Sequence, residues 1–145
     1  MTLLLARLDQ LLAYVNRRLL DVPDGLLDRD AHFLLNGVPY ETMLGRSTDD
    51  PLVRLIARGP AGYRFAMTAL LHAMEALHLE RGPFTESAEG ATGVVMLAGR
   101  LRGTTEPFEQ VVDVALESNA AARIARAEIT IPEGALTALR TARSA

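Results

Sequence analysis

The last third of the chain holds three runs of strand-forming residues separated by very short connections. The runs are Thr92–Arg102, Phe108–Glu117 and Arg123–Ile131, and between them lie Gly103–Pro107 and Ser118–Ala120. Connections this short cannot carry a crossover helix, so successive strands are expected to run antiparallel. The pattern therefore predicts a meander and argues against a doubly wound parallel sheet.

The opening segment, residues 3–20, has the spacing of an amphipathic helix. Its apolar residues recur at steps of three and four positions, which would gather them on one face. These residues are Leu4, Leu8, Leu11, Val15 and Leu19. The helix is expected to stop at Asp21–Gly25, because this segment contains both a proline and a glycine.

A hairpin is predicted next, around Asn36 and Gly37. Asn-Gly between two apolar stretches suits a type I′ turn, which needs positive φ at both central residues. Pro39 cannot donate to a ladder, so the second strand should be short or lie at an edge. A further helix is expected over Pro51–Arg58, with Gly59–Gly62 as the loop that ends it.

Residues 63–80 fit two interpretations. In a helix their apolar residues would form one stripe, and in a strand a different set of apolar residues would line one face. Their Ala, Leu and Met content favours the helix. The segment has few β-branched residues, which weakens the strand interpretation. A polar loop is expected over 81–90.

This order of elements predicts an α+β fold in which helices cover one face of a curved antiparallel sheet. The length of 145 residues suits a single domain, 1–145, with its core over about 3–131. Residues 132–145 are expected to form a C-terminal tail or a short helix, because Pro132–Gly134 interrupts the last strand.

Composition excludes several classes of function. The chain has no cysteine, so disulfides, thiol catalysis and cysteine-bound metals are ruled out. A net charge of −3 and the absence of tryptophan argue against a nucleic-acid partner. The apolar start is interrupted by Arg7 and Asp9, and no stretch is long enough to span a membrane. We therefore expect a cytoplasmic protein without a membrane partner.

Motifs for cofactors and metals are weak. Gly59–Gly62 lacks the lysine and spacing of a phosphate-binding loop. The pattern of His72, Glu75 and His78 does not bring three ligands together on either a helix or a strand. Asp28 and Asp30, four and two positions before His32, are expected to serve in caps and turns. We predict neither a cofactor nor a metal.

Two places offer polar groups beside apolar ones. Tyr14 lies at the edge of the opening stripe, where its hydroxyl could reach a cavity or water. In the segment that begins at Phe108, alternation puts Glu109 and Asp113 on the face opposite Phe108. Either these carboxylates face water, or both faces are covered and one of them is an acid inside a pocket.

Several segments resemble the nuclear transport factor 2-like superfamily, which includes SnoaL-like polyketide cyclases and ketosteroid isomerases. Gly93–Leu101 followed by Pro107–Val111 is similar to the penultimate hairpin of that superfamily. The opening also fits, with Tyr14-Val15 on a helix, then Asp24–Leu26, Asn36-Gly37 and Asp50-Pro51. The resemblance implies a cone: a strongly bent sheet around an apolar cavity, with residues 63–78 largely in a strand. It also implies a homodimer through the outer sheet face.

The resemblance assigns roles to individual residues. Tyr14 resembles the helix tyrosine that donates a hydrogen bond to a substrate oxyanion in ketosteroid isomerases, and Glu109 resembles the acid beside it. The carboxylate that shuttles the proton has no counterpart near Leu35-Asn36, which leaves His32 or Asp113 as a substitute base.

Three hypotheses follow, in this order. The first is a binding or accessory protein for an apolar ring compound, held in a pocket inside the bent sheet. The second is a SnoaL-like cyclase or isomerase that acts on a carbonyl substrate, with Tyr14 and Glu109 as donors and His32 or Asp113 as the substitute base. The third is a structural dimerisation module.

Overall fold

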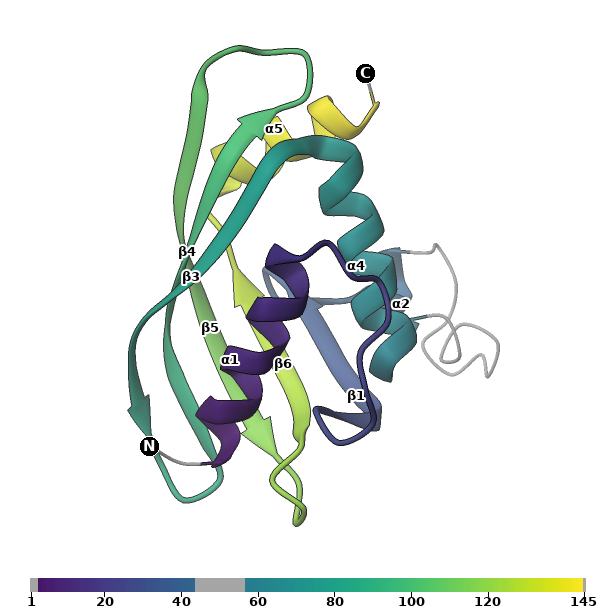
Figure 1. Ribbon diagram of the computed structural model, residues 1–145, viewed down its shortest axis with the longest axis vertical. Helices are drawn as coiled ribbons and strands as arrows, with labels where there is room; N and C mark the ends of the chain where they lie inside the picture. The colour runs from purple at the N-terminus through teal and green to yellow at the C-terminus, as the bar shows by residue number, and fades with distance from the viewer. Residues whose placement is uncertain (1–2, 44–56, 145) are drawn as a thin grey trace.

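The computed structural model describes residues 3–43 and 57–144, which form one six-stranded sheet with helices on its concave side (Figure 1). The elements are α1 (Leu3–Asn16), β1 (Leu27–Leu35), β2 (Val38–Pro39), α2 (Tyr40–Met43), α4 (Gly59–Ala73), β3 (Met74–Glu86), β4 (Gly90–Leu101), β5 (Pro107–Ser118), β6 (Ile124–Thr130) and α5 (Glu133–Ser144). The strands lie in the order β2-β1-β6-β5-β4-β3. The predicted α+β class with a bent sheet is confirmed.

The meander predicted for the C-terminal half is also confirmed, since β3, β4, β5 and β6 pair antiparallel in sequence order. The sheet as a whole is mixed, because β1 runs parallel to β6, with Leu27 opposite Ile124 and Leu35 opposite Ile129. This parallel pair was not expected. The last segment forms the helix α5, which packs against α4.

The first helix is shorter than predicted. It ends at Asn16 rather than at residue 20, and Arg18 has a left-handed φ of 59°. Asn16 turns its side chain to β3, where its Nδ2 donates to the carbonyl oxygen of Leu79 over 2.8 Å. The backbone N–H of Leu79 donates in return to Oδ1 of Asn16 over 2.7 Å. These two bonds compete with further helical turns and fix the end of α1 against the edge of the sheet.

The hairpin is where the sequence placed it. Asn36 and Gly37 have φ values of 51° and 80°, as a type I′ turn requires. β2 has two residues and pairs with β1 at the edge, as Pro39 predicted. The helix expected over Pro51–Arg58 falls mainly on residues outside the described part of the chain.

The ambiguous segment is divided between a helix and a strand. Residues 63–73 belong to α4, so the strand implied there by the family resemblance is wrong and the local composition was the better guide. The expected loop over 81–90 is also wrong for most of its length, because β3 runs on to Glu86. Gly59–Gly62 does not form a loop; it begins α4, with Pro60 in the first turn.

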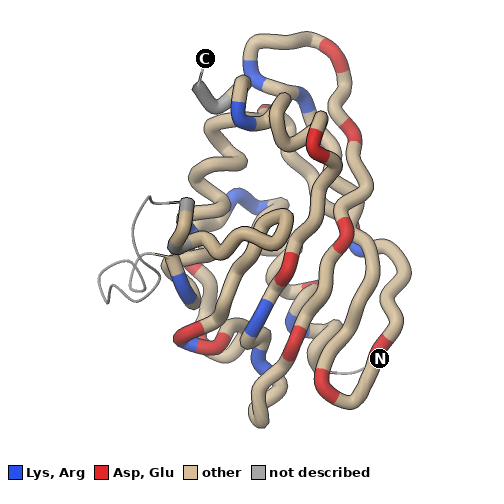
Figure 2. Tube along the Cα trace, turned by 180° about the vertical axis from the view of Figure 1, so that it is seen from behind, with Lys and Arg blue, Asp and Glu red and all other residues tan. Residues whose placement is uncertain are grey.

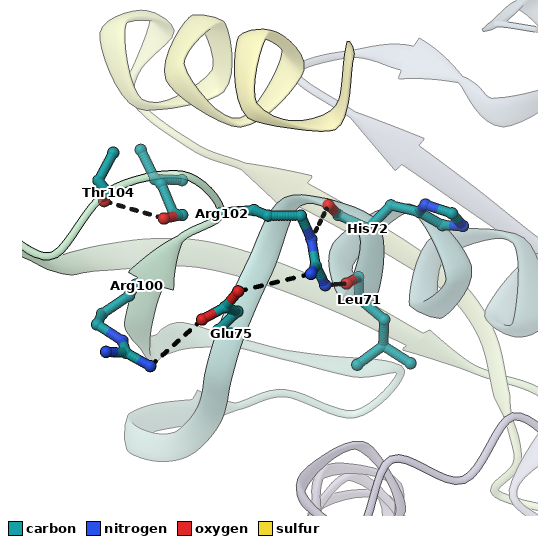
Figure 3. A network of polar contacts seen from close by, with 7 residues as sticks. Leu71, His72, Glu75, Arg100, Arg102 and Thr104 are labelled. Carbon is teal, nitrogen blue, oxygen red and sulfur yellow. Dashed lines mark hydrogen bonds and ion pairs between the residues drawn. The ribbon is translucent and has the colours of Figure 1, made fainter. Parts of the chain in front are cut away.

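Arg102 marks the change from α4 to β3. Its Nε donates to the carbonyl oxygen of His72 and its Nη2 to that of Leu71, both over 2.8 Å (Figure 3). Its Nη1 lies 3.5 Å from Glu75, which also pairs with Arg100. The last carbonyls of a helix lack partners inside the helix, so a guanidinium there is a C-terminal cap.

The two faces of the sheet differ in character. The concave face carries Val95 and Leu97 of β4 and Val112, Val114 and Leu116 of β5, all buried against the helices. The outer face is exposed, and the view from behind shows acidic positions distributed along its strands (Figure 2). Within the described residues, no helix has the length and apolar character needed to cross a membrane.

Candidate functional site

Tyr14 lies on the concave side of the sheet, close to a second tyrosine. Its helix α1 packs on the sheet through buried leucines, and Tyr14 itself is half-buried. Tyr63 of α4 is buried, and its hydroxyl donates to the carbonyl oxygen of Leu19 over 2.6 Å. Burial, with a smaller contribution from Tyr14, raises the pKa of Tyr63 to about 12. Tyr63 is thus an occupied donor, whereas the Tyr14 hydroxyl has no hydrogen-bond partner within 3–43 and 57–144.

The other three predicted residues lie on the opposite side of the sheet. Glu109 and Asp113 are exposed and are paired across β4 and β5 with Ala98 and Val94. His32 of β1 is paired with Arg126 of β6. Glu109 and Asp113 lie on the outer face, because the alternate positions of β5 are the buried ones. His32 also lies on the outer face, because its neighbours in β1, Ala31 and Phe33, are buried. The structure therefore does not bring Tyr14 together with Glu109, Asp113 or His32.

Packed side chains occupy the described part of the concave side, where the sequence implied an apolar cavity. Met67, Met74, Leu77 and Ile124 are almost completely buried there. The ring of Tyr40 stacks on Phe33 with centroids 5.4 Å apart. Neither of the two hollows described next lies in this core.

The larger hollow, of about 630 Å³, is a groove beside the start of α4. The loop before β1, the start of β1, the first turn of α4 and the residue before β6 form its walls. Its lining residues are Pro23, Asp24, Gly25, Leu27, Arg29, Asp30, Arg58, Pro60, Ala61 and Arg123. We call this hollow the α4 groove. It combines apolar lining residues with charged side chains, as small-molecule sites commonly do.

Two glycines allow α4 to approach β1 closely enough to form this groove. A Cβ at Gly59, which has a φ of 61°, would lie 2.2 Å from the carbonyl oxygen of Arg29. A Cβ at Gly62 would lie 2.7 Å from the ring of Phe33. Since neither position has room for a side chain, these glycines bring the first turn of α4 against β1.

Charged groups in and beside the α4 groove are held by specific contacts. Arg58, only 8% exposed, donates from Nη1 to Oδ2 of Asp30 over 3.1 Å. Asp28 accepts from the backbone N–H of Asp30 over 2.8 Å and from Nδ2 of Asn119 over 2.7 Å. These two hydrogen bonds, and the nearby charge of Arg123, lower the pKa of Asp28 below its ordinary value.

Sequence reasoning did not find the α4 groove. It interpreted Gly59–Gly62 as a loop and gave Asp28 and Asp30 turn and cap roles, whereas the structure places both aspartates in strand β1. The arginines Arg29, Arg58 and Arg123 are far apart in the chain and follow no motif. A signal existed in Gly59 and Gly62, whose spacing indicates close approach of the backbone to another element.

The smaller hollow, about 380 Å³, is a shallow depression on the outer face that Asp113 helps to line. Glu128 and Thr130 of β6 and Val94 of β4 lie in the same wall. Nearby on this face, Met96 and Val111 are cross-strand partners and are 42% and 49% exposed. The described residues contain no cluster of three or more acidic or histidine side chains that could hold a metal.

No protein-family model matches this sequence, and no curated protein matches it. Solved structures do match its fold. A SnoaL-like polyketide cyclase from Agrobacterium tumefaciens aligns with a TM-score of 0.66 at 14% identity, over 94% of this chain and 97% of the other. The chain has the nuclear transport factor 2-like fold. The resemblance seen in the sequence is thus confirmed at the level of the fold.

Two further structures with the nuclear transport factor 2-like fold are similar to this one. TerC, co-crystallised with polyporic acid, aligns with a TM-score of 0.70 at 10% identity, over 94% of this chain and 96% of TerC. A steroid delta-isomerase from Pseudomonas aeruginosa aligns with a TM-score of 0.60 at 18% identity, over 97% of this chain and 88% of the isomerase. At identities this low, the structural similarity establishes a common fold, and function has to be argued from the residues of the site.

Proposed function

We propose that this protein binds a small organic molecule in the α4 groove. The observation that carries the proposal is the groove itself. Its volume of about 630 Å³ is within the usual range of ligand pockets, roughly 300–1,000 Å³, and it offers charged groups beside apolar residues. Small-molecule binding also agrees with the fold neighbour that was crystallised with polyporic acid.

The location differs from the pocket inside the bent sheet that the resemblance implies. On the described part of the concave side, buried side chains pack into one hydrophobic core, and we therefore place the site in the α4 groove. A cyclase or isomerase site built on Tyr14 and Glu109 has less support, because the sheet lies between these two residues.

A titration of the full-length, ¹⁵N-labelled protein with small ring compounds, followed by amide NMR shifts, tests the proposal. We expect the shifts to cluster at residues 23–30, 58–61 and 123. Ala61→Trp, which places a large side chain in the groove, should abolish binding. Thr68→Trp, an exposed position on the same helix, should bind as the wild type does. Shifts that map to the outer face, or binding that survives Ala61→Trp, would refute the proposal.

We also propose that two copies associate through the outer sheet face. The exposed pair Met96 and Val111, with Val94 beside it, forms an apolar strip on strands β4 and β5. Contiguous exposed apolar groups on a sheet commonly mark an interface. In sedimentation velocity experiments we expect a dimer that Val111→Asp converts to a monomer. Val38→Asp, which changes a valine on β2 that is 41% exposed, should leave the dimer intact. A wild-type monomer at high concentration would contradict this proposal.

A further inference from the structure

The α4 groove carries more positive than negative side chains, on a chain whose net charge is −3. Three arginines line it, Arg29, Arg58 and Arg123, against Asp24 and Asp30. Clefts with an excess of one sign of charge attract ligands of the opposite sign. The groove therefore differs from the outer face, whose hollow is lined by Asp113 and Glu128.

The three arginines differ in burial and in their contacts. Arg58 is buried and bonded to Asp30, so it forms part of the wall and its charge is compensated. The side chain of Arg29 is exposed and makes no hydrogen bond or ion pair within the part of the chain that the structure describes. Arg123 is half-buried and acts on Asp28 through its charge. Arg29 and Arg123 are thus the cations with donor groups to offer a ligand.

The neighbouring surface supplies a place for an apolar body. Leu27, which is 4% exposed, lines the groove together with Pro60 and Ala61. Pro60 also removes one backbone donor from the first turn of α4, so this wall is largely apolar. A ligand with an oxyanion at one end and a flat apolar part at the other would satisfy both kinds of surface.

We propose that the α4 groove recognises the oxyanion of a small organic acid, a carboxylate or a phosphate ester, through Arg29 and Arg123. The apolar part of the ligand lies against Leu27, Pro60 and Ala61. Guanidinium groups suit this task, because their paired N–H donors match the oxygens of carboxylate and phosphate. This inference rests on the proposed function and names the ligand class.

The test compares matched probes on the full-length protein at pH 7, by NMR titration. Benzoate and benzamide have nearly the same shape and differ in charge, while phenyl phosphate and inorganic phosphate separate an ester from the free anion. We expect benzoate or phenyl phosphate to bind at least about tenfold more tightly than benzamide, as expected for charge-assisted hydrogen bonds. The stronger of these two ligands identifies the oxyanion.

Variants assign the effect to residues. Arg29→Gln and Arg123→Gln should each weaken the preferred acid at least about threefold, and Asp24→Asn should strengthen it. Arg17→Gln, which removes an exposed charge from the end of α1, should have no effect. The gain expected for Asp24→Asn keeps the test decisive if an arginine variant folds poorly.

The outcomes distinguish failure of the oxyanion inference from failure of the proposed small-molecule binding in the α4 groove. If benzamide binds in the groove as tightly as both benzoate and phenyl phosphate, the oxyanion inference is overturned and the proposed function is left standing. Inorganic phosphate binding as tightly as phenyl phosphate would support the anion site and overturn the claim of an organic ligand. If no probe shifts the groove amides, both are overturned.

Discussion

The guanidinium of Arg102 in the β4–β5 loop donates a 2.8 Å hydrogen bond to the carbonyl oxygen of His72, one residue before the end of α4 (Figure 3). Two parts of the chain about thirty residues apart are joined at this point. The contact explains why the helix can end in the middle of an apolar sequence without a glycine or a proline. Arg102 supplies the donors that the last helical carbonyls require.

Replacing Arg102 should destabilise the protein. We expect Arg102→Ala to lower the free energy of unfolding by about 1–2 kcal/mol, since it removes two hydrogen bonds to backbone carbonyls at a partly exposed site. Urea denaturation followed by circular dichroism measures the change. Arg102→Lys keeps the charge and loses the fork of donors, and should recover less than half of the loss. Full recovery by lysine would show that charge alone stabilises this end of α4.

Asn36 should be sensitive to two separable changes. Its Nδ2 donates to the carbonyl oxygen of Ile131 over 2.9 Å, the N–H of Ile131 donates to its Oδ1 over 2.8 Å, and its φ is 51°. Asn36→Gly tolerates this φ but loses the side-chain bonds, at a cost of about 1–2 kcal/mol. Asn36→Ala loses the side-chain bonds and also places a Cβ at a positive φ, so it should cost about 1 kcal/mol more than Asn36→Gly. Equal unfolding free energies for the two variants would contradict a contribution from the left-handed backbone.

Asp28 should make stability depend on acid pH. The backbone N–H of Asp30, the side chain of Asn119 and the charge of Arg123 lower its folded-state pKa below 3.8. A lowered pKa stabilises the folded protein above the unfolded-state value, and this contribution is lost as pH falls through the folded-state value. We therefore expect the advantage of the wild type over Asp28→Asn to be present at pH 7 and to shrink below about pH 4. Unfolding curves at several pH values measure it, and a constant difference would be the contrary result.

Tyr63 should make stability depend on alkaline pH with the opposite sign. Its folded-state pKa is raised to about 12, first by burial. Its contribution is complete below the unfolded-state pKa near 10 and is lost as pH rises through 12. In a spectrophotometric titration, Tyr63→Phe should remove about a third of the tyrosinate absorbance, since the chain has three tyrosines, and the loss should come from the region near pH 12. Loss from the region near pH 10 would show that the buried hydroxyl is accessible.

The parts of the fold predicted correctly are those encoded by local sequence. The hairpin follows from Asn36-Gly37, and the meander from the short connections between strands. The parallel pairing of β1 with β6 has no local signature, because Leu27 and Ile124 are far apart in the chain. Gly82 and Pro83 suggested a loop, yet β3 continues through them because it is an edge strand with a register shift between Arg81 and Phe84.

The candidate site was less accessible from sequence. Alternation correctly placed Glu109 and Asp113 on the face opposite Phe108, and it left open whether that face was covered; the structure shows both residues exposed. The catalytic roles that the resemblance suggested for Tyr14 and Glu109 remain untested. The α4 groove depends on a loop, a strand and a helix that meet through tertiary packing, and the spacing of Arg29 and Arg123 in the sequence does not reveal their proximity.

The parallel pair of β1 and β6 has a consequence for the synthesis of the chain. β1 leaves the ribosome before α4, β3, β4 and β5, but β6, which flanks β1 along most of its length, emerges only after all of them. Until then, Ala31 and Phe33, which are buried in the finished protein, lack the neighbour that completes their layer. The sheet can therefore close only after β6 has been synthesised, and until then the nascent chain has to remain soluble with one edge of β1 unpaired.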